Sequence, residues 1–132
     1  MIQFYGVKAQ VYLKYEGDIE NLSQKISLGM ILPNFSFDTD MEPPHEVFGY
    51  CEALGFEICL RKYMESKDYT YSLTLETELS IKESFNGQMH DISPWLARFI
   101  SKICEIESCI EIKNEKFSFI NGQVNHPSRS LK

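Results

Sequence analysis

Apolar and polar residues alternate most regularly in the middle of the chain. The alternating positions are Tyr69, Tyr71, Leu73, Leu75 and Thr77, and the residues between them are polar. A period of two is typical of a strand that has one face in the core and the other in water. A second segment, residues 2–15, is rich in valine, leucine and tyrosine and predicts a first strand, in which Gly6 marks either a bulge or a close approach of the backbone.

A helical spacing follows the first predicted strand. Ile19, Leu22 and Ile26 recur on one face of a helix, and Asp18 stands where a capping side chain is expected. Gly29 lies where the residue after a helix often takes a left-handed conformation. We therefore expect a short helix that begins after Asp18 and ends before Gly29.

A second helix is predicted in the last third of the chain. Ser93 supplies an N-cap and the proline after it fits the first helical position. Four apolar residues follow at the spacing i, i+3, i+4 and i+7, namely Leu96, Phe99, Ile100 and Ile103. We expect all four to face the core.

Short apolar segments between turn residues predict the remaining strands. They span residues 35–37, 46–50, 56–63, 109–112 and 117–120, with turns at 53–55, 86–87 and 121–122. The elements do not follow a regular βαβ repeat, so the expected fold is α+β: an antiparallel-dominated sheet with two helices packed on one face. We expect a single domain over residues 1–125 and a flexible C-terminal tail over residues 126–132.

Composition narrows the class of protein. The 132 residues are 43% hydrophobic and 24% charged, which is a globular profile. We find no apolar run of membrane-spanning length and no signal peptide, so we expect a cytoplasmic protein with no membrane role. The four cysteines show no CxxC spacing and are expected to be buried thiols, without disulfides or a metal.

The charge distribution points to a class of partner. The formal net charge is −6, and the stretch 26–60 contains no Lys or Arg but six acidic residues. Such a chain repels nucleic acid and anionic membranes, so the charge serves solubility or favours a basic partner. The predicted partner-binding residues cluster around a loop that contains two prolines, and they are Asp38, Asp40, Glu42 and Glu46.

No catalytic or metal site is recognisable. The histidines at 45, 90 and 126 lack metal-ligand spacing, and no nucleophile elbow or phosphate-binding glycine loop is present. His90 and Asp91 are adjacent, so in a strand they point to opposite faces, and we expect them to bond backbone groups near the helix entry. We predict a protein that is not an enzyme and that has no cofactor.

Three segments carry a family resemblance. They are Pro43–Glu46, the strand pair around Gly49 and Gly55, and the run Asn86–Leu96. Over residues 1–112 the chain resembles the immunity proteins of bacterial contact-dependent growth inhibition systems. This resemblance implies a cytoplasmic protein that binds the C-terminal toxin domain of a cognate effector, often a basic nuclease, and blocks its active site or its docking to substrate. It assigns no catalytic residue.

Two other functions stay open at this point. The chain could be a small-molecule-binding domain or another protein-interaction domain, and less readily a small enzyme. A deep apolar pocket with converging polar groups would favour the former, and a histidine–carboxylate pair within hydrogen-bond reach would favour the enzyme.

Overall fold

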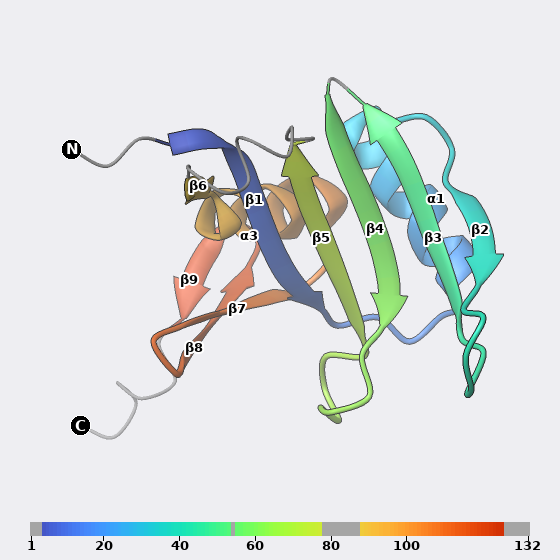
Figure 1. Ribbon diagram of the computed structural model, residues 1–132. Coiled ribbons are helices and arrows are strands. Elements are labelled where there is room, and N and C mark those ends of the chain that lie inside the picture. The colour runs from blue at the N-terminus through green and yellow to red at the C-terminus, as the bar shows by residue number, and fades with distance from the viewer. Residues whose placement is uncertain (1–3, 54, 78–87, 126–132) are drawn as a thin grey trace.

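The computed structural model describes residues 4–53, 55–77 and 88–125, which form one sheet and two helical segments (Figure 1). The strands are β1 (Phe4–Leu13), β2 (Ser36–Thr39), β3 (Val47–Ala53), β4 (Phe56–Lys62), β5 (Tyr71–Thr77), β6 (Gln88–Asp91), β7 (Ser108–Ile112), β8 (Glu115–Ile120) and β9 (Gln123–Asn125). The helices are α1 (Ile19–Met30) and α3 (Ser93–Phe99), and α3 continues as the π-helix η1 (Ile100–Cys104).

The sheet has nine strands in the order β2-β3-β4-β5-β1-β7-β8-β9, with β6 also paired to β1. Every pairing is antiparallel except that of β1 with β6, which confirms the predicted α+β class. Of the two roles expected for Gly6, the bulge is present, because Gly6 has φ 88° and the β1–β6 register shifts between Phe4 and Val7. Strand β1 lies in the middle of the sheet, with β5 on one side and β6 and β7 on the other.

The core lies between the sheet and the two helices. Alternate residues of β1, β4 and β5 point toward the helices, and Val11, Leu60 and Leu73 are each 0% exposed. Helix α1 packs against β3 and β4, whereas α3 packs against β1 and β7 on the same face (Figure 1). No helix of the described part covers the opposite face, which we call the open face, and none is long and apolar enough to cross a membrane.

Helix α1 begins as predicted and ends differently. The Asp18 carboxylate accepts a hydrogen bond from the backbone N–H of Asn21 at 2.8 Å, which is an N-cap. Gly29 is inside the helix, and Ile31 takes the left-handed conformation with φ 56°. The physical role of Gly29 is close packing, because a Cβ atom there would lie 2.5 Å from the sulfur of Cys104 in η1.

The second helix also departs from its predicted geometry. Its N-cap is the isoleucine before Ser93, and the Ser93 hydroxyl instead accepts a hydrogen bond from the N–H of Gln10 in β1. Leu96 and Ile100 are 0% exposed as expected, but Ile103 is 50% exposed and was wrongly placed in the core. The cause is the π-helix, which turns less per residue than an α-helix, so Cys104 at 4% exposure faces the core instead.

The last strands form hairpins. Strands β7 and β8 pair antiparallel, and the predicted turn between β8 and β9 has positive φ at Asn121 and Gly122. The sequence did not indicate β6 or β9. The predicted turn at 86–87 and the predicted tail at 126–132 lie outside the described residues.

Candidate protein-binding surface

Residues 28–52 gather at one edge of the sheet, and we call this region the acidic end. It comprises the last residues of α1, the edge strand β2, the turn after it and most of β3 (Figure 1). It contains no Lys or Arg, and its five carboxylates are Asp38, Asp40, Glu42, Glu46 and Glu52. Folding therefore concentrates the basic-residue-free stretch of the sequence at one end of the molecule.

The four predicted partner-binding residues lie on β2 and on the turn that joins β2 to β3. Asp38 is exposed on β2, and its carboxylate accepts the backbone N–H of Thr39 at 2.8 Å. The turn is closed by backbone hydrogen bonds, because the N–H of Asp40 donates to Glu46 and the N–H of His45 donates to Glu42, both at 2.9 Å. Glu42 is exposed and Glu46 is half-buried. These carboxylates are thus held on one short, ordered segment.

Asp40 differs from the other three because its charge is balanced within the protein. Its carboxylate accepts two hydrogen bonds from one guanidinium nitrogen of Arg61 in β4, at 3.0 and 3.2 Å. The same guanidinium lies 4.4 Å from the centre of the Phe48 ring, and the Asp40 hydrogen bond raises the pKa of Arg61. Asp40 therefore ties the turn to the sheet, whereas Asp38, Glu42 and Glu46 form no ion pair among the described residues.

Large apolar side chains are exposed at the same end of the molecule. They are Leu28, Ile31, Phe37, Met41, Val47 and Tyr50. Ile31 and Met41 are 90% and 93% exposed, so water surrounds almost the whole of each side chain. Sequence reasoning missed this feature because an apolar residue gives no sign by itself of which face it occupies. Exposed apolar groups among charged residues are typical of protein-binding surfaces.

A hollow of about 440 Å³ opens between α1 and β2 at the acidic end. Its apolar walls come from Leu28, Leu32, Phe35 and Phe37, and its polar walls from Glu20, Ser23, Gln24, Ser27 and Asn34. Ser23 and Ser27 already donate hydrogen bonds to the backbone oxygens of Glu20 and Pro33. The hollow is lined by one carboxylate and by no cation.

The open face carries a row of like charges. In the strand register, Glu52 of β3 lies opposite Glu57 of β4, and Glu57 lies opposite Glu76 of β5. Like charges at directly opposed positions destabilise a sheet. A shallow hollow of about 200 Å³ adjoins them and includes Cys59 and Thr74. The described residues contain no group of three or more side chains placed to hold a metal ion.

His45 and Asp91 form hydrogen bonds with groups close to them in the chain. The Nδ1 atom of His45 lies 3.1 Å from the backbone oxygen of Asp40, within the turn. The carboxylate of Asp91 accepts hydrogen bonds from the backbone N–H and the hydroxyl of Ser93, which confirms its expected role at the helix entry. His90 is exposed on β6, and His126 lies outside the described residues.

All four cysteines are free thiols, and three of them are buried as expected. Cys51, Cys104 and Cys109 are at most 6% exposed, and burial raises the pKa of each thiol. Cys59 is half-buried; burial raises the pKa of its thiol and Arg61 opposes that shift. The buried three act as small apolar side chains.

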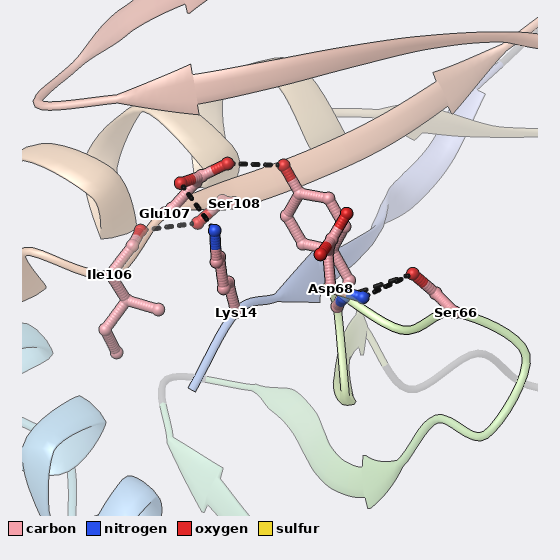
Figure 2. A network of polar contacts seen from close by, with 7 residues as sticks. Lys14, Ser66, Asp68, Ile106, Glu107 and Ser108 are labelled. Atoms are coloured by element: carbon pink, nitrogen blue, oxygen red, sulfur yellow. Dashed lines mark hydrogen bonds and ion pairs between the residues drawn. The ribbon is translucent and has the colours of Figure 1, made fainter. Parts of the chain in front are cut away.

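A separate polar network joins the loop between β4 and β5 to the start of β7 (Figure 2). The Glu107 carboxylate accepts a hydrogen bond from the hydroxyl of Tyr69 at 2.7 Å and lies 3.8 Å from the ammonium of Lys14. The Ser66 hydroxyl accepts the N–H groups of Asp68 and Tyr69. Burial, and then the bond to Glu107, raise the pKa of Tyr69. These groups bond to one another, so the role of the network is structural: it holds the loop between β4 and β5 against the start of β7.

Comparison of the chain with protein-family models, with curated protein sequences and with solved structures finds no match in any of the three.

Proposed function

We propose that this protein is a cytoplasmic immunity protein, which binds a basic toxin domain through the acidic end and blocks the toxin's active site or its docking to substrate. One observation carries the proposal: at the same edge of the sheet lie exposed apolar side chains and three carboxylates that form no ion pair among the described residues. The resemblance to immunity proteins of contact-dependent growth inhibition systems supports the same conclusion independently of the geometry.

Charge complementarity supports the proposed binding. A nuclease domain presents cations to the phosphates of its substrate, and a carboxylate-rich surface is complementary to those cations. Asp38, Glu42 and Glu46 are available for this role, since Asp40 is already held by Arg61. Complementary charge accelerates association, and carboxylates that become buried against a basic side chain slow dissociation.

The exposed apolar side chains of the acidic end also support the proposed binding. Charge alone gives fast but weak association, whereas tight interfaces are centred on buried apolar or aromatic anchors. Phe37 and Tyr50 lie on the two strands nearest the sheet edge, one on each face. A partner that covers this edge would bury both rings and would meet the carboxylates at its rim.

The acidic end supports binding more than catalysis. The hollow between α1 and β2 is lined by no histidine or cysteine, and its two serines already donate to backbone oxygens. The proposal therefore includes no catalytic residue, cofactor or metal.

Charge reversal tests the proposal. We would combine Asp38→Lys, Glu42→Lys and Glu46→Lys, leave Asp40 intact, and measure binding to the toxin domain encoded by the adjacent reading frame. The expected loss is about 2–5 kcal/mol of binding free energy, with slower, less salt-sensitive association and no protection of cells that express the toxin.

The matched control reverses three exposed carboxylates outside the acidic end: Glu105 after η1, Glu111 on β7 and Glu115 on β8. It should bind and protect as the parent does. Equal binding by the first variant, with circular dichroism showing it folded, would remove the acidic end as the inhibitory surface. Failure of the parent to bind the adjacent toxin domain would contradict the immunity function.

A further inference from the structure

The hollow between α1 and β2 combines features that suit one kind of side chain. Its apolar wall includes the ring of Phe37, which is 37% exposed, and the side chain of Leu28, which is 82% exposed. Gly49, opposite Phe37 in the register, has no side chain, and a Cβ atom there would lie 2.9 Å from the Phe37 ring. The missing side chain lets the ring lie against the backbone of β3, which fixes one wall of the hollow.

The polar wall offers hydrogen-bond acceptors that no group of the described part of the chain uses. Among the described residues, the side chains of Glu20, Gln24 and Asn34 make no hydrogen bond and no ion pair. Glu20 adds a negative charge, and the two amides add carbonyl oxygens. Lys25 of α1 does not line the hollow. Its charge instead acts on Cys104 of η1, where it lowers the thiol pKa and so opposes the effect of burial.

We propose that this hollow receives an arginine side chain of the basic partner, with its stem on Leu28 and Phe37 and its guanidinium on Glu20. Arginine matches the site because it carries an apolar stem, stacks on aromatic rings and donates from five N–H groups in a planar fork. Lysine has the charge but lacks the fork and the planar surface. A purely apolar side chain would leave the carboxylate and the amides of the polar wall without partners.

This inference rests on the proposed function, in which the partner is a basic protein. It adds an anchor residue to that function. The partner's arginine would place its charge on Glu20 and bury its apolar stem in the same hollow. Residues of this kind dominate the binding energy of protein interfaces. The remaining carboxylates of the acidic end would then surround the anchor and steer the approach.

The test uses small probes, so it does not depend on the identity of the toxin. N-acetyl-arginine amide, N-acetyl-lysine amide and N-acetyl-leucine amide would be titrated into the ¹⁵N-labelled full chain. The arginine probe should shift the side-chain amide signals of Gln24 and Asn34 with one dissociation constant on the order of millimolar. The lysine probe should bind several-fold more weakly, and the leucine probe should not saturate.

Variants separate the two walls of the hollow. Glu20→Gln should lower the affinity for the arginine probe at least threefold. Phe37→Leu should also lower that affinity, because it removes the aromatic ring but keeps the wall apolar. Glu115→Gln is the matched control, since it removes the same charge from β8, at the other side of the sheet, and should change nothing. Equal binding of the leucine and arginine probes, or arginine shifts that avoid Gln24 and Asn34, would overturn the inference.

A final measurement separates this inference from the proposed function. Glu20→Gln should weaken binding to the adjacent-gene toxin domain about tenfold, and Glu115→Gln should not. If the toxin binds the parent and the Glu20 variant equally, the arginine anchor is wrong and the immunity function stands. If the arginine probe binds as described but the toxin does not bind the parent, the immunity function is wrong, and so is the anchor in its stated role.

Sedimentation of the parent must show a monomer, because a second copy of the chain in the hollow would also contradict the assignment of the hollow to an arginine of the partner.

Discussion

The π-helix at the end of α3 gives Ile100 and Ile103 different burial, which the sequence pattern does not predict. An uninterrupted α-helix would place Ile100 and Ile103 on the same face, and both would be buried. In the structure Ile100 is 0% exposed and Ile103 is 50% exposed. Replacing each by alanine should therefore have very different effects on the free energy of unfolding.

The magnitudes follow from burial. Isoleucine to alanine removes three carbon groups, worth about 2.4 kcal/mol in transfer free energy when fully buried, and the cavity raises the cost at Ile100 to about 3–4 kcal/mol. At Ile103 roughly half of the transfer term applies and no cavity forms, so the expected cost is about 1 kcal/mol or less. Cys104→Ser should cost about 1–3 kcal/mol, because it buries a hydroxyl at a position that is 4% exposed.

Equilibrium unfolding in urea, followed by circular dichroism, measures all three variants. The slopes of the unfolding curves should match that of the parent, so that the midpoints report stability. An Ile103→Ala variant as unstable as Ile100→Ala would refute the reasoning, because the helix would then keep its α-helical phase through residue 103.

Three further predictions concern packing, hydrogen bonding and thiol chemistry. Gly29→Ala should destabilise the fold by about 1–2 kcal/mol, since overpacking against Cys104 outweighs the better helix propensity of alanine, and adding Cys104→Ala should restore most of the loss in thermal unfolding. Tyr69→Phe should cost about 1–2 kcal/mol in urea, since it removes a hydrogen bond to the Glu107 carboxylate. Because the pKa of the Tyr69 hydroxyl is raised in the folded protein, the protonated hydroxyl stabilises the fold below pH 10.0, which is its ordinary pKa. That stabilisation is lost as the pH rises further. The free energy of unfolding of the parent should therefore fall more steeply than that of Tyr69→Phe above about pH 10. In native protein a thiol reagent should modify Cys59 first, and simultaneous reaction of all four cysteines would contradict their different burial.

The strands were predictable where burial follows a simple period. In β5 the buried residues are Tyr71, Leu73 and Leu75, as the alternation indicates, because one face of the sheet meets the helices and the other does not. The cap at Asp18 was predictable for a similar reason, since it depends on groups within three residues. Local chemistry determines such features, so the sequence reveals them directly.

Features that depend on distant contacts were not predictable. Gly29 resembles a helix terminator in sequence, and only the position of Cys104 shows that it is a point of close approach. Asp40 resembles a free carboxylate, but Arg61, 21 positions further on, is brought beside it by the pairing of β3 with β4. The hollow of the candidate site is likewise formed by α1 and β2 together, and no spacing within either segment indicates it.

The central position of β1 has a consequence for how the chain acquires its fold. The N–H of Val7 donates to Thr77, 70 positions away, and that of Gln10 donates to Ser93, 83 positions away. Strands β2 to β5 pair with their immediate neighbours in sequence, so they can assemble while later residues are still being synthesised. Strand β1 is synthesised before β5, β6 and β7, so it must wait for them before its hydrogen bonds are complete. Closure of these long loops should limit the refolding rate, which we expect in the millisecond-to-second range typical of non-local sheets.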